Sequence, residues 1–538
     1  MIQFFKNKIN FIFFVAILWQ LISVGLIGVG VWPLEAAWVN TALLAGIIIF
    51  LAPVDAIGIF LISLPFMIIL PNPWLEDFPM WRPLMALVFI VVIVKHAWII
   101  VRAKQIRQHL QQLWHEKVSW WDVVLWVLFA VGIVSVLFAR FPAHGLKQII
   151  YVLNAYALYI TARLIISTEN YTRLLKYLKV SLGITIVLGF VQYILTLFGE
   201  PYYFWQYWAS MISSTYYGLG LSNVLVYSNS WFSSDGGNRA LRMFGIVQDT
   251  HAFGVVAIFG LAVYSASAFI KQKTISLQEV IRSQSWKYWL MLVLLCFAVV
   301  ASGTRGIWIA MLAPAVITLW LLWRYRANVL TVIPLISYAL VIALFVLSPF
   351  ITIGLNYVRT MNTDDNFLNR AASIYDLSEN SNAGRLEIWQ HSLSYAIHHP
   401  LGTGYGNFIV SLFPNDNGSS YEQLASTENE RYNLPEKFIT AHSLYLHLLV
   451  ELGLIGLILF LGICVYLAWR VLQALRAVNF QAGVHSSLLI NAGLAIAWLL
   501  AYGLFDVTIL NERVLLYTMM FLVFINFSIS EIKSHGNK

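Results

Sequence analysis

The chain is a succession of long apolar runs separated by short polar segments. Most runs contain about 17 to 25 residues, the length that an α-helix needs to cross the hydrocarbon core of a bilayer. They lie at 11–32, 38–52, 54–70, 83–101, 119–139, 146–167, 175–198, 244–270, 287–303, 305–323, 328–353, 443–469, 484–503 and 513–530. The pattern predicts an all-α integral membrane protein, a polytopic bundle of about 12–14 transmembrane helices. The lower number applies if 38–70, which contains Pro53 and Asp55, is a re-entrant hairpin.

Composition supports a membrane protein and excludes other classes. The chain is 60% hydrophobic with a mean hydropathy of +0.75, whereas soluble domains are about half apolar. A net charge of +8 could indicate a nucleic-acid partner, but the basic residues are scattered among short loops rather than clustered. The two cysteines, Cys296 and Cys464, each lie inside an apolar run. We therefore expect no nucleic-acid partner, no disulfide framework and no cysteine metal site.

The distribution of positive charge predicts the orientation of the chain. Lys6 and Lys8 precede the first apolar run, which is longer than the core of a signal peptide. If the amino terminus is cytoplasmic, 20 of the 33 Lys and Arg residues fall on the cytoplasmic side, although the outer segments are much longer. This bias follows the positive-inside rule. We expect a retained first helix and both termini in the cytoplasm.

Two outer segments are longer than a turn, 199–243 and 354–441. Loops of this length are usually functional or disordered. The second segment contains a predicted helix that Asn382 caps and Pro400 ends, with one apolar face formed by Leu386, Trp389, Leu393 and Ile397. Such a helix would lie along the membrane or cap the bundle. We expect residues 1–538 to form one membrane domain, with 354–441 covering a site on its outer face.

Four charged or titratable residues lie at the predicted outer boundary: Arg242, Arg305, Arg385 and His442. The arginine fork is permanently charged and binds phosphate oxygens through paired hydrogen bonds. Histidine readily accepts a proton near neutral pH. This combination favours a site for an anionic, diphosphate-bearing lipid-linked substrate, with displacement at a sugar carbon. Arginines would offset the charge on the departing diphosphate while the histidine activates an incoming hydroxyl.

Simpler interpretations exist for each of these residues and their neighbours. A single outer arginine is more often a snorkelling anchor, and Arg239 could act in place of Arg242. We expect His251 to be structural. An ion pair is expected to explain the acids and the base of the last outer turn, Asp506, Glu512 and Arg513.

Other polar positions carry weaker signals. The acidic pair Glu76 and Asp77 could bind a divalent cation, although capping or solvation is the expected role. The glycine-rich run at 402–406 lacks the Lys and Ser/Thr of a phosphate loop, so we expect a turn.

Several landmarks occur in a fixed order along the second half of the chain. They are Ser302-Gly303-Thr304-Arg305-Gly306, Gly384-Arg385 with Trp389, His442-Ser443 followed by Gly453 and Gly456, and Gly503-Leu504-Phe505-Asp506. Over roughly residues 240 to 530, this set resembles the O-antigen ligase and O-antigen polymerase family of bacterial proteins. The amino-terminal half matches only as a run of helices.

The resemblance implies a metal-independent, cofactor-free glycosyltransferase of the GT-C type. It would act in cell-surface polysaccharide biosynthesis, in lipopolysaccharide or exopolysaccharide, at the periplasmic face of the bacterial inner membrane. The donor would be glycan on undecaprenyl diphosphate. Arg305 and Arg385 would hold the diphosphate, and His442 would assist the acceptor hydroxyl. Arg242 is a looser carry-over from the family. From the residues themselves we also expect Arg239, Trp389 and Ser443 to contribute to substrate binding.

Three activities share this family's scaffold, and the sequence leaves them open. A ligase transfers finished glycan to a lipid A core sugar, a polymerase extends a chain on the carrier, and a third type glycosylates protein. The absence of an added soluble domain argues mildly against the third type. We lean slightly towards a ligase. A flippase or transporter of lipid-linked oligosaccharide is the alternative from another class, but it should place ionisable residues near the membrane midplane, where this chain has few.

Overall fold

The computed structural model describes most of the chain. The described residues are 2–72, 78–102, 120–199, 201–218, 231–235, 238–269, 277–326, 328–358, 380–411, 440–478 and 483–536. Glu76 and Asp77 lie outside them.

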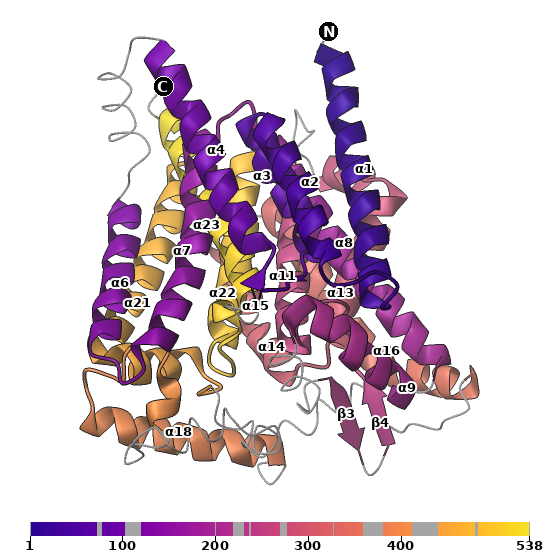
Figure 1. Cartoon of the computed structure of the whole chain (residues 1–538), viewed down its shortest axis with the longest axis vertical. Helices are drawn as coiled ribbons and strands as arrows, with labels where there is room; N and C mark the ends of the chain where they lie inside the picture. Colours follow the sequence, from indigo (N-terminus) through magenta and orange to yellow (C-terminus); the bar gives the residue numbers. More distant parts are fainter. Residues whose placement is uncertain are drawn as a thin grey trace.

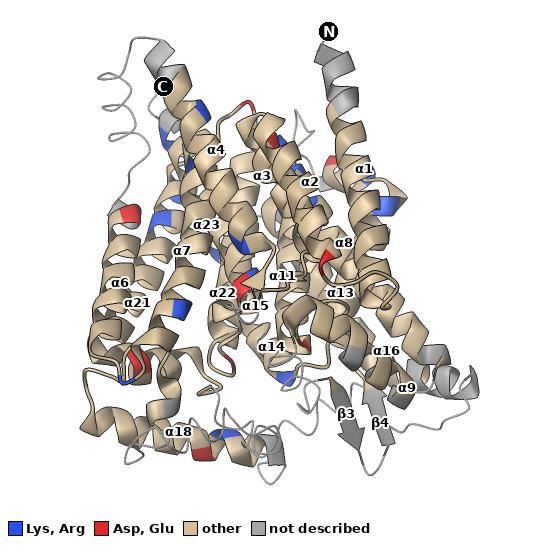
Figure 2. Cartoon of the chain, in the orientation of Figure 1, with Lys and Arg blue, Asp and Glu red and all other residues tan. Residues whose placement is uncertain are grey.

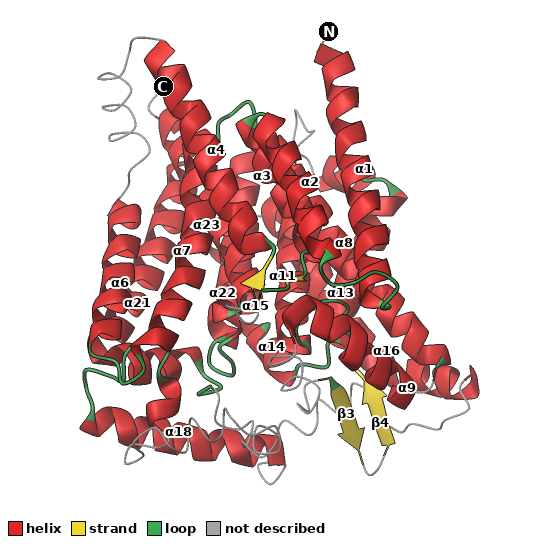
Figure 3. Ribbon diagram, in the orientation of Figure 1, coloured by secondary structure: helices red, strands yellow, loops and turns green. Residues whose placement is uncertain are grey.

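Apolar helices make up almost the whole fold (Figures 1 and 3). Ten spans in the described part are long and apolar enough to cross a membrane. They fall in α1 (Ile2–Gly28), α4 (Trp81–Arg102), α7 (Pro142–Ile165), α8 (Tyr171–Phe198), α11 (Thr250–Ser267), α14 with α15 (Arg305–Ala310 and Leu312–Tyr325), α16 (Asn328–Val358), α21 (Leu444–Ala477), α22 (Val484–Tyr502) and α23 (Glu512–Gly536). The predicted all-α polytopic membrane fold is confirmed.

Four shorter apolar helices complete the bundle: α2 (Ala36–Phe50), α3 (Pro53–Ser63), α6 (Trp120–Leu137) and α13 (Trp286–Ala301). The segment 38–70, for which two forms were open, contains two separate helices, α2 and α3. Pro53 starts α3, where its missing N–H costs no helical hydrogen bond. A 3₁₀ turn, Leu64–Phe66, follows α3, and strand β1 (Ile69–Leu70) then pairs with β2 (Phe78–Pro79).

Helix α11 forms the centre of the bundle and packs against α8, α13 and α22. Its membrane-spanning stretch is 89% buried, so it is shielded from lipid on nearly every side. The sequence allows this because small residues recur along the helix, and small residues let neighbouring helices approach closely. Figure 2 shows that long stretches of the helices carry no charged residue, as the apolar runs predicted.

The two ends of the chain lie at one end of the bundle, and helix α18 (Asn380–His398) lies across the opposite end (Figure 1). We call this opposite end the α18 end. The hairpin of β3 (Phe232–Asp235) and β4 (Asn238–Leu241) lies there too, near the short helix α9 (Pro201–Tyr207).

Helix α18 exists as predicted, but it begins at Asn380 and packs through a different face. Its buried positions follow a four-residue spacing at Gly384, Ile388, Ser392 and Ala396. Three of the four side chains expected to pack are exposed: Leu386, Leu393 and Ile397. The mainly small side chains of the buried face let the helix lie close to α21, with Ile388 packed against Ala441 and Val450. The larger residues remain outside this contact.

Candidate functional site

The segment between the β3–β4 hairpin and α11 carries Arg242. Its backbone N–H donates to the Trp231 carbonyl at 2.8 Å. The buried amide of Gln192 in α8 donates to the Arg242 carbonyl at 3.2 Å and accepts from the N–H groups of Phe244 and Gly245 at 3.0 and 3.1 Å. One side chain therefore bonds to three backbone groups of this segment and fixes where Arg242 enters the bundle.

The turn between α13 and α14 lies directly beside Arg242. Gly303 has a φ of 64°, a conformation that side-chain-bearing residues rarely adopt. A Cβ at this position would lie 2.9 Å from Cδ of Arg242, so glycine leaves room for the arginine to cross the turn. Arg305 follows as the first residue of α14 and is 8% exposed. Two arginines far apart in the sequence thus belong to one small region.

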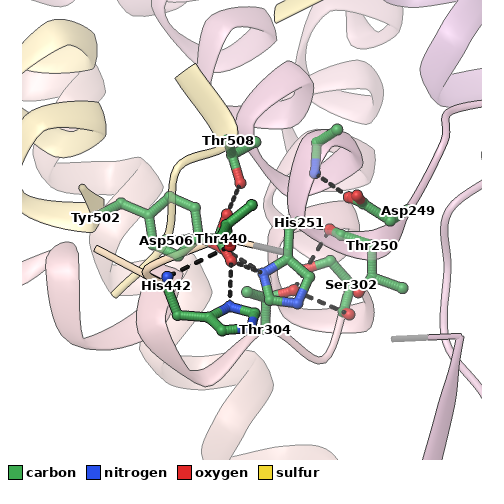
Figure 4. A network of polar contacts seen from close by, with 11 residues as sticks. Asp249, Thr250, His251, Ser302, Thr304, Thr440, His442, Tyr502, Asp506 and Thr508 are labelled. Carbon is green, nitrogen blue, oxygen red and sulfur yellow. Dashed lines mark hydrogen bonds and ion pairs between the residues drawn. The ribbon is translucent and has the colours of Figure 1, made fainter. Parts of the chain in front are cut away.

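The start of α11 faces the same turn. Asp249 caps the helix, because its carboxylate accepts from the Ala252 N–H at 2.7 Å. The Thr304 hydroxyl donates to the Thr250 carbonyl at 3.4 Å, which ties the turn to α11. Burial raises the pKa of the Asp249 carboxyl, although the positive charge of His251 opposes that rise. His251 lies in the first turn of α11 and points towards the end of α22 (Figure 4).

Asp506, in the turn after α22, is the centre of the polar network in Figure 4. Its Oδ2 lies 3.0 Å from Nδ1 of His251 and 3.8 Å from Nδ1 of His442. Its Oδ1 accepts from the Thr508 hydroxyl at 2.5 Å. Burial alone would raise the pKa of the Asp506 carboxyl, but the charges of the two imidazoles and the close contact with His251 hold it well below its usual range. Asp506 is therefore a carboxylate shared between two histidines.

His442 reaches this network from the residues just before α21. Its φ is 45°, in the left-handed region that is unfavourable for a residue with a Cβ. Local strain of this kind persists only where the surroundings impose it, and it is frequent at functional sites. Here the Leu444 N–H donates to the Gly503 carbonyl at 2.7 Å, and Nε1 of Trp389 donates to the Ala441 carbonyl at 3.1 Å. These bonds hold both flanks of His442, whose side chain keeps 30% exposure.

Helix α18 brings Arg385 to the same place. Its guanidinium interacts electrostatically with the hydroxyl of Tyr502 at the end of α22. That hydroxyl lies 2.5 Å from Nδ1 of His251. Helix α14, which begins with Arg305, packs against α22, and Nε1 of Trp498 donates to the Ile307 carbonyl at 2.8 Å. The structure thus places the four boundary residues that the sequence singled out on neighbouring elements of one region.

The remaining predicted residues differ in how closely they approach this group. Trp389 holds the backbone before His442, as described above. Ser443 is buried at 4% exposure in the N-cap position of α21. For Arg239 only the backbone is described, and it pairs with Ser234 in the β3–β4 hairpin.

The prediction of a local ion pair around the last outer turn was wrong. Glu512 binds Arg82 of α4 at 2.8 Å, and Arg513 donates to the carbonyls of Met67 and Ile246 at 2.7 and 3.4 Å. Asp506 instead contacts His251 and His442. Its place in the Gly503–Asp506 landmark was the one sequence signal that could have indicated its role.

The arrangement combines fixed positive charge with an oriented imidazole. Arginines can bind a doubly charged phosphate group through paired hydrogen bonds. A carboxylate that faces one nitrogen of an imidazole fixes its tautomer and leaves the other nitrogen available for proton transfer. In the described part of the chain, no three His, Cys, Asp or Glu side chains are grouped so that they could hold a metal ion.

Comparison with known proteins gives an independent result. Residues 290–461 match the family model described as O-antigen ligase. The matched range contains Arg305, Arg385 and His442, whereas Arg242, His251 and Asp506 lie outside it. No curated protein matches the sequence. The match confirms the family resemblance over residues 290–461, and it supports a ligase- or polymerase-type function in polysaccharide biosynthesis for this multi-pass membrane protein.

Proposed function

We propose that the protein is an O-antigen ligase-like glycosyltransferase of the GT-C type. It transfers glycan from undecaprenyl diphosphate to an acceptor hydroxyl at the periplasmic face of the bacterial inner membrane. The observation that supports the proposal is a set of three arginines and a histidine–aspartate pair on neighbouring elements, the 303 turn, α14, α18 and the ends of α21 and α22. The arginines are Arg242, Arg305 and Arg385, and the pair is His442 with Asp506.

Each group has a defined part in the proposed reaction. The acceptor hydroxyl oxygen forms a bond to the anomeric carbon of the glycan, and the bond from that carbon to the diphosphate oxygen breaks. His442 takes the hydroxyl proton on Nε2, because its Nδ1 faces Asp506. The 3.8 Å between Nδ1 and the carboxylate is long for a hydrogen bond, as is common before substrate binds. The arginines bind the diphosphate and offset the charge that it gains on leaving.

An apolar cavity next to the site supports a lipid-linked donor. It has a volume of about 420 Å³ and lies between α6, α7, α15, α21, α22 and α23. Leu444, Leu448 and Leu452, on the first turns of α21, line the end nearest the site. A hydrocarbon chain in this cavity would have its polar head close to His442.

The proposed orientation has support from charge and from architecture. The positive-inside rule predicts both termini in the cytoplasm, and the two ends of the chain lie opposite the α18 end (Figure 1). The site would then face the periplasm, where lipid-linked glycan is presented.

Reconstitution in proteoliposomes tests the proposal. Purified protein receives undecaprenyl-diphosphate-linked glycan with lipid A core, or with no second acceptor. Transfer to core identifies a ligase, and chain growth on the carrier identifies a polymerase, the second candidate within the family. Absence of both products, together with movement of the donor across the bilayer, would refute the proposal and favour a transporter.

Variants then test the site itself. Alanine at Arg305, Arg385 or His442 is expected to abolish transfer with normal expression, and Arg305→Lys should also fail because lysine has no planar fork. Arg140→Ala is the matched control, since this exposed arginine lies between α6 and α7, outside the site. Near-normal transfer in all three alanine variants would overturn the assignment of these residues.

A further inference from the structure

Helix α21 is broken at Gly453, about three turns after its start beside His442. Gly453 has φ 67° and ψ −171°, which is not helical, and helical geometry resumes after it. A Cβ at this position would lie 2.3 Å from the Pro400 carbonyl oxygen. The break therefore makes room for another part of the chain. It also separates the segment Leu444–Leu452, which we call the roof segment, from the rest of α21.

The turn at 400–404 fills the break. It satisfies backbone groups that the interruption leaves without helical partners. The Thr403 N–H donates to the Val450 carbonyl at 2.8 Å, and the Gly404 N–H donates to the Glu451 carbonyl at 2.9 Å. In return, the Leu454 N–H donates to the Pro400 carbonyl at 2.9 Å. Three backbone hydrogen bonds thus join the segment after α18 to α21.

The side chain of Glu451 adds a further link. It is 2% exposed, and its Oε1 accepts from the Phe408 N–H at 3.0 Å. Nε2 of His447, one turn earlier, lies 3.4 Å from the same oxygen, and the Phe408 ring stacks on the His447 ring at 4.9 Å. A buried carboxylate is costly unless it is bonded. Its principal hydrogen bond here goes to the segment that follows α18, and not to another transmembrane helix.

The roof segment supports both halves of the candidate site. Leu444 at one end is bonded to Gly503, close to Asp506, and the residue before Ser443 is His442. Val450 towards the other end belongs to the same buried apolar cluster as Ile388 of α18. His442 and Arg385 are therefore both positioned by the roof segment. Glu451 bonds the segment that follows α18 to it.

We infer that Glu451 is a positioning residue for the transfer reaction. Its carboxylate holds the Phe408 N–H, and so the segment after α18, against α21, and it thereby sets the distance between Arg385 on α18 and His442. It acts through these two residues and does not touch substrate. The inference rests on the proposed function for its effect on activity, but its geometric part can be measured separately.

The geometric test measures the position of α18 against α21. Spin labels are placed at Ser394 and Ile458, both exposed, after Cys296 and Cys464 are replaced by alanine. Pulsed electron resonance in nanodiscs should give a narrow distance distribution for the otherwise unchanged chain. Glu451→Ala should broaden it. Glu451→Gln should keep it narrow, because the amide oxygen still accepts from the Phe408 N–H.

The kinetic test uses the same variants in the proteoliposome assay. Loss of a charge-assisted contact to the donor through a displaced Arg385 should raise the donor KM of Glu451→Ala by about tenfold or more. Glu451→Gln should restore it to within about twofold of the unchanged protein. Glu387→Ala, an exposed acid on α18, is the control.

The outcomes separate the two proposals. An unbroadened distribution in Glu451→Ala, an unchanged donor KM, or failure of Glu451→Gln to rescue either measurement would overturn the positioning role. If the unchanged protein transfers no glycan while Glu451→Ala still broadens the distribution, the proposed function fails, and the structural link between Glu451 and α18 stands.

Discussion

Substitution of Asp506 by asparagine tests the centre of the polar network. Asparagine has nearly the same volume, and its amide oxygen can still accept from the Thr508 hydroxyl, which lies 2.5 Å from Oδ1. The other terminal atom becomes an NH₂ group that faces Nδ1 of His251 and Nδ1 of His442. A donor cannot orient an imidazole through its protonated nitrogen. The substitution therefore removes the orientation of His442 while it preserves the packing.

The magnitude follows from what His442 is proposed to do. A positioned general base contributes about 10²–10⁴-fold to a reaction. We expect single-turnover glycan transfer by Asp506→Asn to fall by about 10²-fold or more, with little change in donor affinity, because the arginines are untouched. Glu512→Gln is the matched control on the same turn, since Glu512 pairs with Arg82 and not with a histidine. It should lower Tm and keep the transfer rate of the folded fraction.

The pH dependence of stability gives a second measurement. The folded-state pKa of Asp506 lies well below its usual 3.8 because the two imidazoles favour the carboxylate. A carboxyl group with a lowered pKa in the folded state stabilises that state fully at pH values above its unfolded-state pKa. This stabilisation is lost as the pH falls through the folded-state pKa. The Tm difference between unchanged protein and Asp506→Asn should therefore shrink below pH 3.8, not above it. Transfer by Asp506→Asn at the normal rate, with His442→Ala inactive, would refute the reasoning.

Three further predictions concern the rest of the site. Gly303→Ala should cost about 1–2 kcal/mol of stability for the left-handed backbone and should raise the donor KM by displacing Arg242; a normal KM, measured by initial rates, would contradict this contact. Leu448→Trp should fill the apolar cavity and impair transfer from a long-chain donor more than from a short-chain analogue, whereas equal impairment in a paired assay would argue against a lipid tail there. Chelation by EDTA should leave transfer by purified protein unchanged, and strong inhibition restored by a divalent cation would direct attention to Glu76 and Asp77.

Local sequence was sufficient to predict the helices. A run of apolar side chains long enough to cross a bilayer is helical because no other open structure satisfies its backbone in lipid. The same pattern gave the positions where runs end, and charged residues at those ends are conspicuous. Arg305 and His442 lie at such ends, whereas Arg385 lies on the helix that was predicted before Pro400.

Which of these groups meet depends on how distant parts of the chain pack. Asp506 lies 255 positions from His251 along the chain (506 − 251). It contacts two histidines and not the nearby Arg513 because of the way in which α11, α21 and α22 pack. Hydrophobic periodicity also predicted the wrong buried face of α18. The small residues Gly384 and Ala396 are buried there instead of the larger apolar residues that the pattern indicated. Periodicity records which side chains avoid water. It does not record which neighbour covers them, because that choice depends on shape and hydrogen-bond partners from distant parts of the chain.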